Sequence, residues 1–212
     1  MTIDGRIARG DRTRAAVLDR AVARATADGL DGLSLGQLAT DLGVSKSGLF
    51  AHWRSKEELQ LATVERAQEQ FLEQVIRPAL TAPRGVRRLW ALHDRRIAFY
   101  ETDLLPGGCF FAKVQFEFSV RPGVVRDRLA TTFALWSDFV DNLAQLAVRE
   151  GDLRAETDTR QLAYELESFA LTAVMQSRLL SPEIAYRYAR RAAHDRLRTL
   201  ATDPDLLPED PA

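Results

Sequence analysis

Residues 34–53 read SLGQLATDLGVSKSGLFAHW, and this stretch decides the fold. A serine precedes each of two short apolar segments, and Gly43 lies between them, where a tight turn is needed. Leu38, Ala39 and Leu49 are apolar at the positions where two short helices would cross. The spacing predicts a helix-turn-helix, whose second helix can enter the major groove of DNA. The spacing alone fits an ordinary helical hairpin equally well.

Glycine and proline divide the rest of the chain into segments of helix length. β-branched residues are sparse, and no Asn-Gly or Asp-Gly hairpin signal stands between alternating apolar runs. We therefore predict an all-α fold of about nine helices. The expected helices cover residues 11–28, 34–42, 45–51, 55–77, 84–102, 108–119, 122–150, 158–180 and 182–202.

The composition is that of a globular protein: 46% of the 212 residues are hydrophobic and 28% are charged. A single cysteine excludes an intramolecular disulfide and a Cys-rich zinc site. No apolar run approaches the roughly 18 residues of a membrane span, and no apolar segment follows the N-terminal residues. We expect a cytoplasmic protein with no membrane partner.

The charge is unevenly distributed. Residues 6–56 contain nine Lys/Arg and five Asp, a net +4, whereas residues 57–212 contain 20 Lys/Arg and 24 Asp/Glu, a net −4. A mildly basic N-terminal quarter is compatible with a nucleic-acid partner there, although an ordinary solvated surface gives the same asymmetry.

The common catalytic motifs are absent from the sequence. It contains no G-x-S-x-G elbow, no phosphate-binding loop, no H-E-x-x-H and no G-x-G-x-x-G, and its three histidines are far apart. We therefore expect no enzyme, no cofactor and no metal site. An enzyme would need a site assembled from residues distant in the sequence.

Residues 13–59, TRAAVLDRAVARATADGLDGLSLGQLATDLGVSKSGLFAHWRSKEEL, resemble the N-terminal DNA-binding domain of the TetR/AcrR family of transcriptional regulators. The match covers 47 residues without a gap and includes Gly43-Val44-Ser45, Gly48-Leu49-Phe50 and His52-Trp53. A shorter stretch, PGGCFFAKVQFEFSVRPG at 106–123, resembles the ligand domain of one branch of the family. The resemblance implies a three-helix DNA-binding domain over 1–54 and a larger helical domain for ligand binding and dimerisation over 55–202. We expect the acidic tail 203–212 to be disordered.

The resemblance also implies which residues contact DNA. Lys46 would donate to a guanine edge or a phosphate, and Gly48 would let the helix approach closely. The family's usual residue at Phe50 is tyrosine, whose hydroxyl reaches a phosphate, so an apolar contact is expected there instead. Arg9 and Arg12 are further candidates for the DNA backbone or the minor groove. The predicted DNA-binding residues are Arg14, Ser34, Lys46, Ser47, Gly48, Phe50, His52 and Lys56.

A regulator of this family needs a ligand cavity and a dimer surface. Aromatic residues are concentrated in the middle of the chain, and a subset is expected to line an apolar cavity, with His93 as its polar anchor. The predicted ligand-binding residues are Trp90, His93, Ile97, Phe110, Val114, Phe133, Trp136 and Phe169. Ordinary core packing is the alternative for each of them.

The dimer is expected to form through the helices near 158–180 and 182–202. Two apolar stripes mark them, one from Leu162 to Leu180 and an alanine-rich one from Ala185 to Ala193, although both stripes would also suit the core of the domain itself. The whole sequence then predicts a homodimeric regulator of the repressor type that binds a pseudo-palindromic operator and is released by a small-molecule inducer. The alternatives are a ligand-independent DNA-binding protein and a thiol redox sensor through Cys109.

Overall fold

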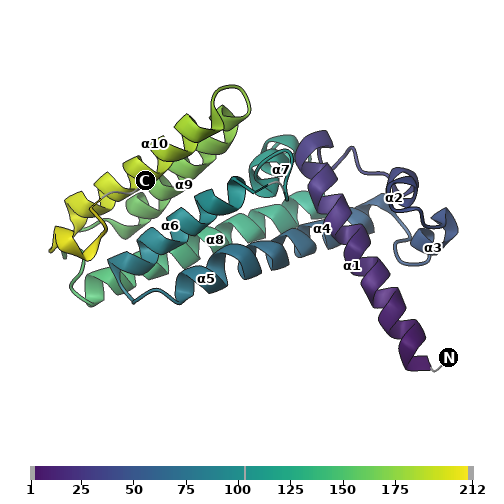
Figure 1. Ribbon diagram of the computed structural model, residues 1–212, viewed down its shortest axis with the longest axis horizontal. Coiled ribbons are helices and arrows are strands. Elements are labelled where there is room, and N and C mark those ends of the chain that lie inside the picture. Colours follow the sequence, from purple (N-terminus) through teal and green to yellow (C-terminus); the bar gives the residue numbers. More distant parts are fainter. Residues whose placement is uncertain (1–2, 103, 210–212) are drawn as a thin grey trace. The chain divides into compact units, whose positions relative to one another are not determined.

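The computed structural model describes residues 3–102 and 104–209, with the backbone alone for residues 3–12. Over these ranges the chain is helical and has no β-strand, as predicted (Figure 1). The helices are α1 (Ile3–Asp28), α2 (Leu35–Leu42), α3 (Lys46–Phe50), α4 (Lys56–Phe71), α5 (Arg77–Leu80), α6 (Val86–Tyr100), α7 (Phe110–Phe118), α8 (Val124–Arg149), α9 (Thr159–Ser177) and α10 (Pro182–Leu200).

Two helices extend further than the sequence predicts. The first begins at Ile3 rather than residue 11, although Gly5 and Gly10 lie within it. The fourth was expected to end before Pro78, but a π-helical turn over Leu72–Ile76 joins α4 directly to α5. Pro78 has no N–H to donate to the preceding turn, and the change to wider π-type pairing just before it lets the helix continue to Leu80. Counted as one helix, α4 and α5 bring the described part of the chain to the nine helices predicted.

The described chain divides into two compact units. One contains residues 3–70 and 104–129, and the other contains residues 71–102 and 130–209. The first unit therefore includes α7 as well as α1–α3, and it does not end at the boundary expected after residue 54. In this unit α7 packs against α1, and α2 packs against α3.

The second unit is a helical bundle in which α10 packs against both α9 and α6. Helices α9 and α10 lie side by side as a hairpin (Figure 1). Their small residues suit this close approach, since Ala173, Ala189 and Ala193 are all buried. The two stripes expected to form a dimer surface therefore face the core of their own unit over most of their length.

The segment after α10 is ordered as far as it is described, contrary to the expected disorder. A 3₁₀ turn covers Pro204–Leu206, and Leu207 is buried. The Pro208 carbonyl lies 2.6 Å from Nε2 of His194, and Arg87 donates to the Leu206 carbonyl at 3.1 Å. One apolar side chain and these polar contacts hold residues 203–209 against the rest of the second unit. The acidic, proline-containing composition of this segment gives no sign of these contacts.

Candidate nucleic-acid interface and cavity

The predicted helix-turn-helix is present in the first unit. Gly43 ends α2 in the left-handed conformation, with φ 62°, and its N–H bonds back to the helix. Ser45 then caps α3, its hydroxyl accepting the Gly48 N–H at 3.2 Å. Leu49 and Trp53 are almost completely buried and fix α3 to the rest of the unit. Each of these features is local in the sequence, which explains why the sequence alone predicted them.

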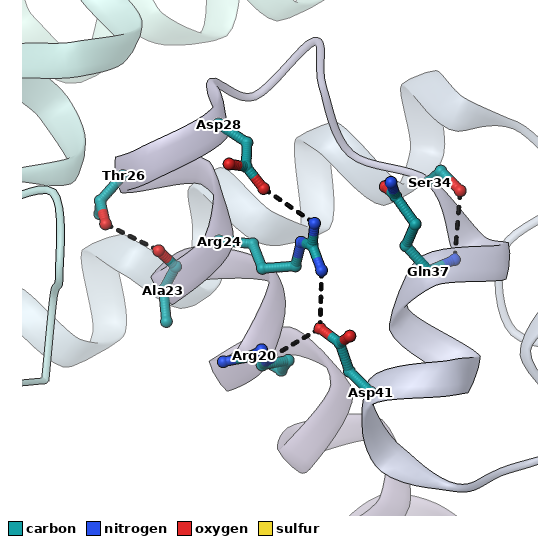
Figure 2. A network of polar contacts seen from close by, with 8 residues as sticks. All are labelled: Arg20, Ala23, Arg24, Thr26, Asp28, Ser34, Gln37 and Asp41. Carbon is teal, nitrogen blue, oxygen red and sulfur yellow. Dashed lines mark hydrogen bonds and ion pairs between the residues drawn. The ribbon is translucent and has the colours of Figure 1, made fainter.

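An ion-pair network holds α2 against α1 (Figure 2). Asp41 on α2 accepts hydrogen bonds from Arg20 at 2.8 Å and from Arg24 at 2.9 Å. Arg24 also donates to Asp28 at 2.9 Å. These arginine hydrogen bonds hold the pKa of Asp41 below its usual value. The network positions α2, and through the Gly43 turn it positions α3.

The exposed surface of α3 brings together most of the predicted DNA-binding residues. Within α3 only Leu49 is buried. The exposed side of the helix and of the turn after it carries the predicted residues Lys46, Ser47, Gly48, Phe50 and His52. A helix held by one apolar side chain, with every other position open, can present this surface to a groove.

Ser34 and Lys46 lie close together although they belong to different helices. The Ser34 hydroxyl caps α2 by accepting the Gln37 N–H at 3.2 Å. A Cβ at Gly36 would contact both the Ser34 hydroxyl and the ammonium end of Lys46. The Lys46 ammonium also lies 5.9 Å from the centroid of the half-exposed Phe50 ring. One hydroxyl, one cation and one aromatic ring therefore share this surface.

Lys56 has a partner within the protein. Its ammonium lies 2.8 Å from Asp31, which also binds Arg121 at 2.6 Å. Hydrogen bonds from these two cations lower the pKa of Asp31 to about 2. A phosphate contact through Lys56, which the resemblance implies, would have to compete with this carboxylate.

Arg14 lies on α1 beside the end of the helix-turn-helix. Its guanidinium is 5.8 Å from the centroid of the Trp53 ring, and the side chain is exposed. A cation–π contact of this kind leaves the guanidinium N–H groups able to donate outward. The side chains of Arg9 and Arg12 lie outside the described part of the structure.

Helix α7 is fastened to the end of α1. The Glu117 carboxylate accepts the backbone N–H groups of Leu30 and Asp31, both at 2.7 Å. The Gly107 N–H donates to the Thr26 hydroxyl at 2.9 Å, and a Cβ at Gly107 would overlap the Thr26 carbonyl oxygen. This fit requires glycine at 107 and joins the segment before α7 to the helix that supports the DNA-binding motif.

The second unit contains a small cavity of about 20 Å³, enough for roughly one water molecule. Apolar side chains form most of its wall, with two charged groups and one imidazole among them. The lining residues are Leu89, Leu92, His93, Arg96, Trp136, Val140, Leu166 and Glu167.

An ion pair between the buried Arg96 and the half-buried Glu167 forms the polar part of this wall. Arg96 donates to both oxygens of Glu167, at 2.6 and 2.8 Å, and the Trp136 indole N–H donates to one of them at 2.8 Å. Burial alone would raise the pKa of Glu167, but the charge and hydrogen bonds of Arg96 outweigh burial and hold that pKa below its usual value. Glu167 is therefore ionised at neutral pH.

His93 is the neutral polar group of the cavity. Burial is the main cause that lowers its pKa to about 3, and the positive charge of Arg96 adds to the effect. Its Nε2 lies 3.1 Å from the Ala189 carbonyl, so the neutral ring donates there. Trp90 stacks beside it, with ring centroids 6.4 Å apart.

Two family models match the chain. The model described as "Bacterial regulatory proteins, tetR family" matches residues 17–63, and "Tetracyclin repressor-like, C-terminal domain" matches residues 85–193, which is about half of the chain. The chain belongs to the TetR family of transcriptional regulators. The prediction made from residues 13–59 is confirmed, and with it the expectation of a DNA-binding transcription factor rather than an enzyme.

Solved structures share the fold of this TetR-family regulator. A TetR transcriptional regulator from Chloroflexus aurantiacus superposes with a TM-score of 0.83 at 24% identity, over 91% of this chain and 98% of that one. A regulator from Saccharomonospora viridis, solved with choline, gives 0.75 at 19% identity over 91% and 100% of the two chains. AibR, solved with isovaleryl coenzyme A and operator DNA, gives 0.64 at 21% identity over 87% and 96%. No curated protein matches the chain significantly.

The regulator's cavity includes only two of the eight predicted ligand-binding residues, His93 and Trp136. Phe110 and Val114 belong to the first unit, where both are buried on α7, the helix that packs against α1, and their part in ligand binding stays a prediction. Trp90 stacks on His93 without lining the cavity, and Ile97 is fully buried core. Phe133 and Phe169 are half-buried on α8 and α9 and are not part of the wall.

Cys109 precedes α7 and is buried, with only 4% of its surface exposed. A redox sensor needs a thiol that an oxidant in solution can reach, and this burial disfavours that alternative. Among the helices that the structure describes, none is long and apolar enough to cross a lipid bilayer.

Proposed function

We propose that the protein is a homodimeric, ligand-responsive transcriptional repressor that acts in the cytoplasm and places α3 of each subunit in the major groove of a pseudo-palindromic operator. The observation that carries the DNA part of this proposal is the exposure of α3, where Lys46, Ser47 and Gly48 form an open surface over a single buried anchor, Leu49. The N-terminal residues of a recognition helix are those that reach base edges.

The dimer is supported by apolar residues left exposed on α9 and α10. Tyr164 and Met175 lie eleven residues apart, about three helical turns, and so share the side of α9 that faces away from its buried stripe. On α10, Ile184 and Tyr188 are exposed one turn apart. A hairpin that carries exposed apolar side chains on its outer side suits a two-fold interface, and this outer side replaces the stripes proposed from the sequence.

Ligand response is supported by the cavity, whose apolar wall carries a few converging polar groups. A volume of about 20 Å³ is too small for an organic effector, so the effector would bind a more open conformer. A cavity this small also suits the alternative of a regulator that binds DNA independently of any ligand. Loss of operator affinity on adding an effector separates the two.

The test of DNA recognition is footprinting on the DNA flanking this protein's own gene, followed by binding assays on the protected site at two salt concentrations. Wild-type protein is expected to prefer that site over random DNA. Lys46→Ala is expected to reduce the preference about 5- to 100-fold, the range for loss of one base-reading side chain.

Lys113→Ala is the matched control, because Lys113 is an exposed lysine on α7. It should retain the full preference for the protected site. An unchanged preference in Lys46→Ala would contradict the assignment of α3 as the recognition helix.

A further inference from the structure

We propose that Arg96 and Trp136 form a receptor for the carboxylate of an apolar organic acid, and that Glu167 fills this receptor in the closed conformer. The inference rests on the proposed ligand response and names the chemical class of the effector. It starts from the three N–H groups that converge on one carboxylate: two from the Arg96 fork and one from the Trp136 indole. An arginine fork with a further donor matches the lone pairs of a carboxylate.

Arg96 is the fixed member of the ion pair. Its Nε donates to the Tyr100 hydroxyl at 2.5 Å, and its guanidinium lies over the rings of Tyr100 and Trp136, 5.6 and 5.2 Å from their centroids. The side chain is 9% exposed. A cation held by two rings, a hydroxyl and a carboxylate is positioned before any ligand arrives.

Glu167 is the exchangeable member. Its side chain is 26% exposed, almost three times the figure for Arg96, so it can turn to water without crossing the core. Removing Glu167 without a replacement would leave a buried arginine unpaired, which is strongly unfavourable. A ligand carboxylate is the replacement that restores every hydrogen bond, whereas a cationic ligand would have to expel Arg96 from its aromatic surroundings.

The remainder of the wall indicates the rest of the ligand. Leu89, Leu92, Val140 and Leu166 are apolar, and His93 is neutral. These side chains suit a hydrocarbon body attached to the carboxylate. Because Leu166 and Glu167 are neighbours on α9, making room for that body moves α9, one of the two helices proposed to form the dimer.

The test is calorimetric titration of the full-length protein, without DNA, at neutral pH. Hexanoate is the probe. Hexanamide and hexylamine, which have the same six-carbon chain with a neutral or a cationic end group, are the comparison compounds. We expect one molecule of hexanoate to bind per chain. Hexanamide should bind at least tenfold more weakly than hexanoate, and hexylamine should not bind.

Two variants test the receptor itself. Glu167→Gln keeps an acceptor for the Trp136 N–H but removes the negative charge that competes with hexanoate for Arg96. Hexanoate should therefore bind this variant at least tenfold more tightly than wild type. It should also raise the melting temperature of the variant more than that of wild type. Arg96→Met should abolish binding. If that variant does not fold, Arg96→Lys, which keeps the charge and loses the fork, should weaken binding at least tenfold.

Glu101→Gln is the control, because Glu101 is also bound by an arginine fork in this unit, that of Arg190 at 2.9 and 2.7 Å. Hexanoate affinity should be unchanged in it. The proposal is overturned if hexylamine binds in place of hexanoate, if Glu101→Gln tightens binding as much as Glu167→Gln, or if Glu167→Gln binds none of the three. Because DNA is absent, these outcomes are independent of whether the protein recognises an operator.

Discussion

Two residues of this regulator have unusual environments that lead to predictions: Phe50 is an aromatic residue exposed on the recognition helix, and His93 is a buried, neutral histidine. Phe50 is a half-exposed aromatic residue on the recognition helix, where the TetR-family resemblance places a tyrosine. Adding the hydroxyl by Phe50→Tyr is expected to tighten operator binding about fivefold, equivalent to about 1 kcal/mol for one new hydrogen bond to phosphate. A neutral hydroxyl releases no counterion, so the salt dependence of binding should stay the same.

Binding assays over a salt series check the Phe50→Tyr prediction. Phe116→Tyr supplies the control, since Phe116 is similarly exposed on α7. Equal affinity of wild type and Phe50→Tyr would mean that position 50 does not face the DNA backbone.

His93 makes stability depend on pH. The unfolded chain protonates this histidine below about pH 6.5, whereas burial and Arg96 lower its folded pKa to about 3. Between these values the unfolded state binds more protons, so the free energy of unfolding falls as the pH falls. His93→Gln keeps an N–H for the Ala189 carbonyl but does not titrate. From pH 7 to pH 5 its free energy of unfolding should fall by about 2 kcal/mol less than that of wild type.

Denaturant unfolding at the two pH values measures this difference. His52→Gln should follow wild type, because His52 is exposed. If His93→Gln loses as much stability as wild type over this range, His93 is not the group responsible.

At the scale of elements, the predictions from sequence succeeded where structure is local. Breakers and serine caps lie within a few residues of the helix ends that they define, and the whole helix-turn-helix fits into twenty residues. The cavity was not predictable in this way, because Arg96 and Glu167 are 71 positions apart. A partial signal was present: Leu89, Leu92 and Arg96 recur at helical spacing, which places a charge on the core side of α6.

The position of α7 shows a second limit. The contact between Gly107 and Thr26, 81 positions apart, docks the segment before α7 onto α1, and no local pattern in the sequence indicates it. Gly107→Ala is expected to destabilise the first unit by about 1–3 kcal/mol, because the added methyl overlaps the Thr26 carbonyl and the backbone must shift. Thermal unfolding followed by circular dichroism measures this loss.

Gly36→Ala is the comparison for Gly107→Ala. A Cβ at Gly36 meets its neighbours only at ordinary contact distance, and alanine is the better helix former, so this variant should be as stable as wild type or more so. Equal melting temperatures for the two variants would show that the close approach of Gly107 to Thr26 is not needed.

At the scale of the whole molecule, operator recognition requires two recognition helices at a fixed spacing, and the dimer has to supply that spacing. Ile184 and Tyr188 lie one turn apart on the exposed side of α10, so the double variant Ile184→Asp/Tyr188→Asp puts two carboxylates in the proposed interface. Both side chains are exposed within the subunit, so the fold should survive. Sedimentation should show a monomer, and operator affinity should fall more than 100-fold because each monomer contacts one half-site alone.

Leu135→Asp on α8 is the control, because it also replaces an exposed apolar residue by aspartate but lies outside the α9–α10 hairpin; Leu135 is 62% exposed. This variant should remain dimeric and retain operator binding. A double variant that stays dimeric would move the interface away from α10. A monomeric double variant with full operator affinity would instead show that operator recognition does not depend on dimerisation. Displacement of Glu167 on α9 could then not act on DNA binding by changing the spacing of the two recognition helices.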